Sequence, residues 1–385
     1  MPHYMRVGDV PRKRHTLHRH DGEVMFEELV GTDGFSGPSA LLYHGRSPSA
    51  ILRVESAAAE PTCWRPNQPL RPHHLRTSEV PMPEDADIVR GRRMLLGNEA
   101  VEIGFVAATA TSPLYRNAVG DELVFLHAGD AVLESVFGRL PVREGDYVVV
   151  PTGVTHRWVV DGDVDALVIA ARGHVRIPER YLNGSGQLLE GAPFSERDHR
   201  APDPEPLLLD GEEVPVLVRT RDGMSQHVHA THPFDVVGWD GYLYPWAMSI
   251  HDFEPIVGRI HQPPPVHQTF SGKEFAVCSF VPRLFDFDPD AVKVPYHHSN
   301  VDTDEVLFYA QGNFMSRAGS GIGAGSISLH PPGFVHGPQP GSRERSMDQT
   351  RTEEVAVMVD VFRPLALSTA AEAVSDPAYV GSWAR

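Results

Sequence analysis

Cysteine is scarce in this sequence. The 385 residues include two cysteines, Cys63 and Cys278, which lie far apart and outside any spacing typical of thiolate metal sites. A small disulfide scaffold and a zinc-finger-like site are therefore excluded, and the two residues are expected to be reduced thiols. Reduced thiols fit a cytoplasmic protein, which is the location we expect.

Long apolar segments and dense basic runs are also missing. No run of 18 apolar residues occurs, and the opening stretch MPHYMRVGDVPRKRH lacks the apolar core of a signal peptide. The chain has 51 acidic and 34 basic residues, which gives a formal net charge of −17. Because an acidic protein repels phosphate groups, we expect neither nucleic acid nor a membrane as a partner.

Glycine, proline and histidine are abundant instead. The 34 glycines and 34 prolines divide the chain into short apolar runs such as DYVVVPTG, ELVFLHAG and EVAVMVDVF. Few stretches keep a 3.6-residue period, so the sequence predicts a mainly β protein with few helices. The segment ALSTAAEAVS at 366–375 is the one with a helical composition. The 21 histidines are compatible with metal or proton chemistry.

One gapped pattern occurs twice, in the same order, along the chain. Its matching positions in the first and second halves are Tyr115 and His298, Asn117 and Asn300, Glu122 and Glu305, and Gly129 and Gly312. A second pattern follows each copy, as GDYVVVPTGVTH ending at His156 and as GSISLHPPGFVH ending at His336. Two gapped patterns repeated in order indicate a duplicated β unit.

The spacing of these patterns resembles the two motifs of the cupin barrel, a small antiparallel jelly roll. The second half departs from the general cupin pattern at Asn300, which replaces a second histidine, and at Val292, which replaces the leading glycine. Strand alternation in such a barrel sends Glu305, Leu307 and Tyr309 to one face. If that face is the lumen, the glutamate lies inside the barrel.

Two histidines and one glutamate are the candidate metal ligands of the second barrel. His298, Glu305 and His336 are expected to converge from neighbouring hairpins, which would supply the cation that a buried carboxylate needs. Two imidazoles and one carboxylate with open coordination positions form the triad of non-haem Fe(II) oxygenases. Mn²⁺ would tolerate the same ligands, and Zn²⁺ would accept them in a hydrolytic site.

The two halves also define an expected domain organisation. The expected units are an N-terminal arm (1–50), an N-terminal cupin barrel (51–194), a charged and proline-rich linker (195–213) and a C-terminal cupin barrel with the metal site (214–385). In the first barrel Tyr115 stands where the second has a histidine. Glu122 and His156 are then too few ligands, so we expect that barrel to have lost the metal.

The sequence also resembles one bicupin family, the homogentisate 1,2-dioxygenases. The resemblance rests on HPFDVVGWDGYLYP (232–245), GRIHQPPPVHQTF (258–270), the run 296–312 and SLHPPGFVHGP (328–338). The stretch KRHTLHRHDGEVMFEELVGTDGFSG near the N-terminus is similar to bacterial members, so the resemblance spans nearly the whole chain. By this resemblance, His298, Glu305 and His336 match the iron ligands of the family.

Three further residues receive roles from the resemblance alone. His261 matches the acid/base histidine of the family, and His330 matches a histidine close to the metal that contacts substrate. Phe314 stands where the family commonly has a tyrosine that contacts substrate. Because phenylalanine cannot donate a hydrogen bond, either another group substitutes for the hydroxyl or the substrate differs from homogentisate at that oxygen.

The resemblance implies an Fe(II)-dependent dioxygenase that cleaves the homogentisate ring with O₂ to give maleylacetoacetate. His261 would remove the phenolic proton of the aromatic substrate. Family members form trimers and dimers of trimers, so a homo-oligomer is expected. The alternatives are ring cleavage of a related hydroquinone or aminophenol acid, a non-catalytic bicupin binding protein, and a zinc- or manganese-dependent isomerase or hydrolase.

Overall fold

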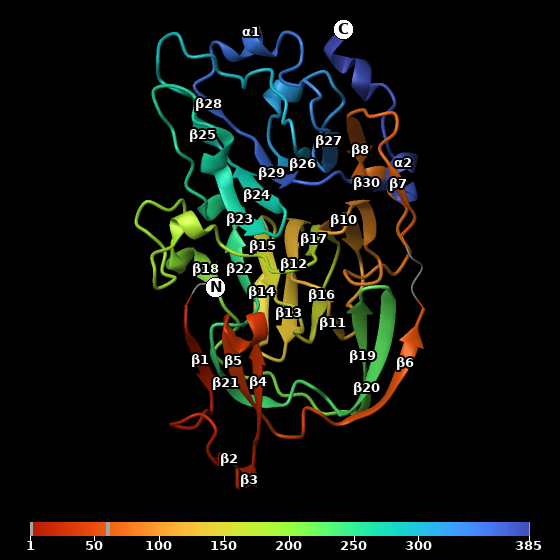
Figure 1. The fold of residues 1–385 in the computed structure, drawn as a ribbon, viewed down its shortest axis with the longest axis vertical. Coiled ribbons are helices and arrows are strands. Elements are labelled where there is room, and N and C mark those ends of the chain that lie inside the picture. The colour runs from red at the N-terminus through yellow and green to blue at the C-terminus, as the bar shows by residue number, and fades with distance from the viewer. Residues whose placement is uncertain (1–2, 59–61, 385) are drawn as a thin grey trace.

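The computed structural model describes residues 3–58 and 62–384 of the chain, and strands dominate it (Figure 1). The mainly β fold class is therefore confirmed. Helical segments are short and lie between strands. They are α1 (Ser342–Ser346), α2 (Thr369–Ala373) and the 3-10 turns η1 (Asp33–Phe35), η2 (Thr77–Glu79), η3 (Glu179–Tyr181), η4 (Glu196–Asp198), η5 (Ile250–Asp252), η6 (Pro264–His267), η7 (Met315–Arg317) and η8 (Tyr379–Ala384).

Two facing sheets form the first barrel. The larger one contains, in spatial order, β18 (His199–Arg200), β22 (Trp246–Ser249), β15 (Asp146–Val150), β12 (Glu122–Ala128), β17 (Val164–Ala171), β10 (Val101–Ala108), β9 (Arg93–Gly97), β30 (Ala366–Ser368) and β7 (Trp64–Pro66). The other contains β14 (Gly138–Val142), β13 (Ala131–Ser135), β16 (His156–Val160), β11 (Tyr115–Asn117), β19 (Glu212–Thr220), β20 (Gly223–Thr231) and β6 (Ile51–Ala57).

The second barrel is built on a further sheet and is closed by loops. Its sheet contains β23 (Gln268–Gly272), β24 (Phe275–Phe280), β29 (Val355–Val361), β26 (Asp304–Gln311), β27 (Ser326–His330) and β8 (His73–Arg76). Across from it lie the short ribbon of β25 (Arg283–Leu284) with β28 (Arg351–Thr352) and the bridge between His298 and His336. This arrangement leaves room for a cavity on the inner face of the sheet.

The strand pairing confirms the duplication. The order β22-β15-β12-β17-β10-β9 in the first barrel repeats as β8-β27-β26-β29-β24-β23 in the second. Gly129 and Gly312 end the equivalent strands at φ values of +80° and +88°. A Cβ at Gly129 or Gly312 would overlap the carbonyl oxygen of Asp163 or Glu353, just before the neighbouring strand, so both turns require glycine.

In each of these two matching series, the first strand, β22 or β8, comes from the other half of the chain. β8 belongs to the expected first unit but pairs with β27, and β22 belongs to the expected second unit but pairs with β15. The expected boundaries at 194 and 214 therefore do not match the strand pairing. The reciprocal exchange covers an exposed edge on each sheet, because the exchanged strand hydrogen-bonds to backbone groups that would otherwise remain unpaired.

Two other segments differ in detail from their expected form. The expected linker 195–213 contains η4 and β18, and β18 pairs with β22. The expected helix at 366–375 is shorter, because residues 366–368 form β30 and α2 begins after Ser368, whose hydroxyl accepts a hydrogen bond from Ala371. Within residues 3–58 and 62–384, no helix has the length and hydropathy of a membrane span.

The N-terminal arm packs on its own chain. Its strands β1 (Met5–Gly8), β5 (Ser39–His44) and β4 (Phe26–Gly31) form a sheet with β21 (Val236–Gly241), and β2 (Arg19–His20) pairs with β3 (Glu23–Val24). Figure 1 shows this red sheet at the end of the molecule opposite to the C-terminus. The arm is thus held by backbone hydrogen bonds to a strand of the second half of the sequence.

Alternate residues of β26 face two different environments. Val306 and Phe308 belong to the continuous core that joins the two barrels, where the Phe308 ring lies 6.2 Å from that of Phe125. Leu307 and Tyr309 belong to a separate apolar cluster inside the second barrel. The period-2 alternation expected from the sequence is therefore present, and it directs Glu305 into the second barrel.

Candidate metal centre

The three expected metal ligands lie together at the inner end of the second barrel. His298 and His336 are joined by a pair of backbone hydrogen bonds of 2.8 and 2.9 Å, and Glu305 follows on β26. One side-chain ligand atom from each residue lies within 4.8 Å of the other two. Among the described residues, no other group of three or more histidine, cysteine or acidic side chains has its ligand atoms this close together.

Backbone contacts set the orientation of both imidazoles. Nδ1 of His298 lies 3.0 Å from the carbonyl oxygen of Tyr296, and Nδ1 of His336 lies 3.0 Å from that of Phe334. A carbonyl oxygen only accepts, so each Nδ1 carries a proton and donates it. The Nε2 atoms of the neutral rings are then lone-pair donors, and they lie 3.5 and 3.1 Å from oxygens of Glu305.

This donor set fits a metal ion. Two Nε2 lone pairs and a carboxylate that point toward one another repel unless the histidines gain second protons or a cation lies between them. Burial by itself raises the pKa of Glu305, but its close contacts with His298, His330 and His336 hold it well below its usual value. The carboxylate is therefore ionised and available as a ligand. Two imidazoles and one carboxylate suit Fe(II), Mn²⁺ or Zn²⁺.

His330 supports the carboxylate instead of facing the cavity. It is the cross-strand neighbour of Glu305, and its Nδ1 lies 3.0 Å from Oε1 of that residue. Its Nε2 lies 2.9 Å from the hydroxyl of Tyr379, and its ring stacks on His336 at 3.9 Å. Its side chain is 0% exposed, and burial lowers its pKa to about 3. The cavity lining does not include this buried ring, so the structure shows His330 as a support for Glu305, and its expected contact with substrate stays a prediction.

Phe314 also lies away from the expected substrate contact. Its ring is 8% exposed and packs edge-on against Tyr309 with the centroids 5.0 Å apart. It belongs to the apolar cluster with Leu307 and Met358, behind the cavity wall. The residues that line the cavity do not include Phe314, and its expected bearing on the substrate stays a prediction.

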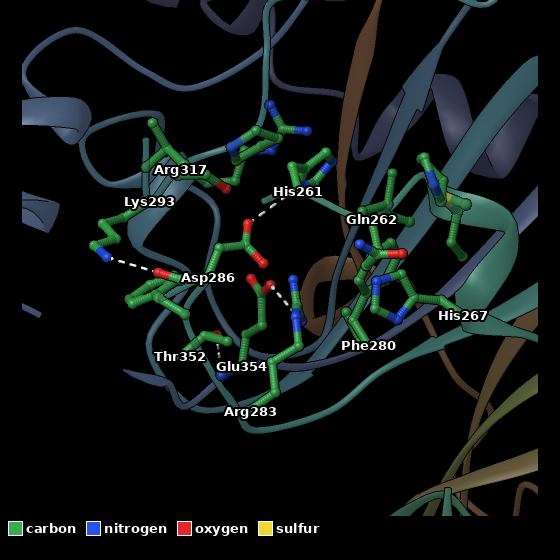
Figure 2. Close-up of a pocket in the computed structure, with 18 of the residues that line it drawn as sticks. His261, Gln262, His267, Phe280, Arg283, Asp286, Lys293, Arg317, Thr352 and Glu354 are labelled. Atoms are coloured by element: carbon green, nitrogen blue, oxygen red, sulfur yellow. Dashed lines mark hydrogen bonds and ion pairs between the residues drawn. The ribbon is translucent and has the colours of Figure 1, made fainter. Parts of the chain in front are cut away.

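A cavity opens beside the three candidate ligands. His298, Glu305, Leu307 and Tyr309 form part of its wall, and loops on the opposite side complete it. His261, expected as the acid/base residue, lines this cavity with its side chain 32% exposed. Figure 2 shows its ring close to Asp286, whose Oδ2 lies 4.0 Å from Nδ1. Burial lowers the pKa of His261, which favours the neutral ring.

Several charged side chains of the cavity carry no signal in the sequence motifs. Arg283, Asp286 and Lys293 come from the segment between β24 and His298, and Glu354 precedes β29. Figure 2 shows Arg283 beside Glu354, with 3.9 Å between Nη1 and Oε1. These residues could not be found by spacing, because they lie in the short strand β25 and in irregular segments outside the repeated motifs.

The corresponding point of the first barrel holds an internal cation. Tyr115 is the antiparallel cross-strand partner of His156, as His298 is of His336. The tyrosine therefore occupies the position of the first ligand. Glu122 accepts hydrogen bonds from the Tyr115 hydroxyl at 2.8 Å, Asn117 at 3.0 Å and Arg92 at 2.8 Å. The guanidinium of Arg92 thus supplies the positive charge that neutralises Glu122.

Comparisons with known proteins agree with this architecture. The sequence profile described as "Homogentisate 1,2-dioxygenase N-terminal" matches residues 43–250. A protein of Saccharolobus solfataricus named "Putative dioxygenase SSO1533" is 39% identical over 387 residues, which cover 100% of this chain and 99% of that protein. The homogentisate 1,2-dioxygenase of Emericella nidulans is 26% identical over 289 residues, which cover 69% of this chain and 62% of that protein.

Solved structures give weaker similarity. A cupin 2 conserved barrel domain protein from Leptotrichia buccalis has a TM-score of 0.34 at 8% identity and covers 75% of this chain and 96% of its own. Protein YlbA from E. coli also has a TM-score of 0.34 at 8% identity, with 79% of this chain and 94% of its own covered. Scores of this size carry no argument about the site.

Proposed function

Because this chain belongs to the homogentisate 1,2-dioxygenase family, a family of dioxygenases, we propose that it cleaves the ring of homogentisate with O₂ to give maleylacetoacetate. The observation that carries the proposal is the cluster of His298, Glu305 and His336 at one end of a cavity. The proposed metal is Fe(II). A ferrous ion held by these three residues would supply open coordination positions and the redox chemistry that O₂ activation requires.

The protein holds the ligand set in a fixed geometry. The Tyr296 and Phe334 carbonyls each orient one imidazole, and His330 with Tyr379 orients the carboxylate. Hydrogen bonds of this kind commonly change metal affinity or activity by about 10- to 100-fold. The network keeps both Nε2 atoms and the carboxylate directed at one point before any ligand arrives.

His261 is the proposed base for the phenolic proton of the substrate. It lines the same cavity as His298, and burial keeps its ring neutral near pH 7. The proton would be accepted at Nε2, because Nδ1 is the ring nitrogen nearer to a carboxylate. A neutral imidazole has a free lone pair and can accept a proton, which is what a general base requires.

Apolar side chains complete the proposed binding site. Leu307, Met358 and Phe280 form the part of the wall contributed by β26, β29 and β24. Such a surface packs against an aromatic ring and excludes water from reactive oxygen species. The substrate ring would lie between this wall and the loop that carries His261.

Oxygen uptake by Fe(II)-loaded protein, with homogentisate and detection of an ultraviolet-absorbing product, tests the proposal. We expect uptake and product in a one-to-one ratio, with both lost in His298→Ala and Glu305→Ala. Uptake with a related hydroquinone or aminophenol acid, but not with homogentisate, would reject the substrate and keep the chemistry. Full iron occupancy without uptake on any of these rings would reject the dioxygenase proposal.

A further inference from the structure

The ring of His261 is held by very few contacts. Among the described residues, no hydrogen bond is formed by either of its ring nitrogens, and its nearest carboxylate oxygen is Oδ2 of Asp286 at 4.0 Å from Nδ1. The edge of the ring packs against Tyr296 at a centroid distance of 4.9 Å and an interplanar angle of 85°. Asp286 and Tyr296 therefore define the directions in which the ring can turn.

Backbone hydrogen bonds tie the segment of Asp286 to the loop of His261. The amide of Phe287 donates to the carbonyl of Gly258 at 3.2 Å, and the amide of Asp288 donates to that of Arg259 at 2.9 Å. On its other side, Phe285 donates to Thr350 at 2.9 Å. The two side chains therefore come from segments that backbone hydrogen bonds hold together.

Asp286 is itself held in place within the cavity wall. Nζ of Lys293 donates to its backbone carbonyl at 3.0 Å, which leaves the carboxylate free (Figure 2). The carboxylate is 18% exposed and has no hydrogen-bond partner among the described residues. A carboxylate that accepts from an imidazole Nδ1–H fixes the tautomer with a lone pair on Nε2. It also stabilises the imidazolium that forms when Nε2 takes a proton.

The charged groups around His261 act in opposite directions. Burial lowers its pKa, Asp286 raises it, and the neighbouring Arg283 and His298 lower it further. The other titratable neighbours of the imidazole are the Tyr296 ring and His267, which lines the same cavity. Asp286 is thus the one group in this set that favours proton uptake by His261.

We propose that Asp286 is a positioning residue for His261: its carboxylate accepts the Nδ1 proton, directs Nε2 into the cavity and stabilises the ring after proton transfer. The inference rests on the proposed function, in which His261 is the base. In apo structures such hydrogen bonds are often longer than in the substrate complex, and 4.0 Å is consistent with a contact that shortens when substrate binds.

The test compares Asp286→Asn with Asp288→Asn. Asp288 lies two residues away, and its carboxylate pairs with Arg259 at 2.7 Å outside the cavity lining, so it is a matched control for charge and loop position. In Asp286→Asn we expect kcat/KM to fall at least about tenfold. The acidic limb of its pH profile should move to lower pH by about one unit. Asp288→Asn should keep the wild-type kcat/KM and the wild-type position of the acidic limb. Asp286→Glu should move the acidic limb part of the way back to its wild-type position.

A direct measurement separates this inference from the proposed function. The ¹⁵N shifts of the His261 ring, assigned with His261→Gln in zinc-loaded, histidine-labelled protein, report the tautomer without turnover. We expect Nδ1–H in the wild type and a mixed tautomer with a lower pKa in Asp286→Asn. Equal tautomers and equal pKa values in both proteins would overturn the role of Asp286, whether or not homogentisate is consumed. Absence of turnover with the expected shifts would reject only the substrate.

Discussion

Glu122 and Glu305 stand at equivalent points of the two barrels, and the protein neutralises them differently. Glu122 is 1% exposed and pairs with the guanidinium of Arg92, whose charge is permanent. Glu305 is 6% exposed and is surrounded by His298, His330 and His336. An internal cation makes the first site a closed structural ion pair. Imidazoles with free Nε2 atoms leave the second site open to an exchangeable cation.

The neighbouring residues follow the same division. The cross-strand neighbour of Glu122 is Val150, whereas that of Glu305 is His330. Tyr115 donates to Glu122, whereas His298 at the equivalent position presents a lone pair. Duplicated scaffolds can thus keep a buried carboxylate and change its function by exchanging two or three neighbours. The predictions below test this contrast, in order of decreasing effect.

Removing the charge of Glu305 is expected to have the largest effect. In Glu305→Gln the metal loses its anionic ligand, so affinity should fall by more than the roughly 100-fold typical of outer contacts, and oxygen uptake should vanish. Metal content per chain after dialysis, measured by mass spectrometry, checks this. Glu122→Gln should retain the wild-type metal content, and loss of metal from that variant would contradict the contrast between the barrels.

Removing Arg92 should cost stability but not metal. Arg92→Met leaves Glu122 buried without its cation, which typically lowers the free energy of unfolding by about 3–5 kcal/mol. Urea denaturation measures the change. The control Arg65→Met removes an exposed pair with Glu372 and should cost less than about 1 kcal/mol. Equal losses in the two variants would show that the guanidinium of Arg92 does not stabilise the first barrel.

Removing the hydrogen bond from His330 to Glu305 should have an intermediate effect on metal affinity. His330→Phe keeps the ring between His336 and Tyr379 but deletes the hydrogen bond to the carboxylate, so metal affinity should fall by about 10- to 100-fold. Competition with a chelator measures this affinity. Val150→Ala changes the equivalent position in the first barrel and should leave it unaltered. An unchanged affinity in His330→Phe would remove the positioning role of this residue.

A pH-dependent loss of stability should arise from a histidine of the first barrel that has no carboxylate partner. His199 lies 4.7 Å from the Trp246 ring, and burial lowers its pKa from 6.5 to about 4. The unfolded chain binds the proton first as the pH falls. Stability is therefore constant above about 6.5 and decreases by about 1.4 kcal/mol per pH unit toward 4.

The variant His199→Phe isolates this contribution. Urea denaturation between pH 7 and pH 4 should show a shallower slope for the variant than for the wild type, by up to about 1.4 kcal/mol per pH unit. His20→Phe, at a half-exposed position in the N-terminal arm, serves as the control. Parallel slopes for His199→Phe and the wild type would mean that His199 is protonated in the folded state.

Local sequence patterns were sufficient to predict a large part of the fold and the group of candidate metal ligands. The alternation around Glu305 and the spacing of the two motifs predicted the duplication and the meeting of His298 with His336. These features follow from the geometry of strands and hairpins, which depends on residues close in sequence. The roles of His330 and Phe314 came from resemblance, and the structure places both behind the cavity wall.

Contacts between distant segments were outside the reach of such patterns. Arg92 lies in neither motif, yet it neutralises Glu122. Asp286 and Glu354 reach the cavity from irregular segments. The exchange of β8 and β22 between the barrels also has no local signal. The sequence of such a strand does not indicate which sheet it pairs with.

The sequence by itself determined that the chain is a mainly β duplication with one complete and one incomplete set of candidate ligands. Residue identity and strand period are local properties, and they decide which side chains share a face. Only the tertiary structure decided which cation each buried glutamate meets, and which sheets β8 and β22 join. Those outcomes depend on packing between residues far apart in the chain, where burial makes an unpaired charge or an unpaired backbone group costly.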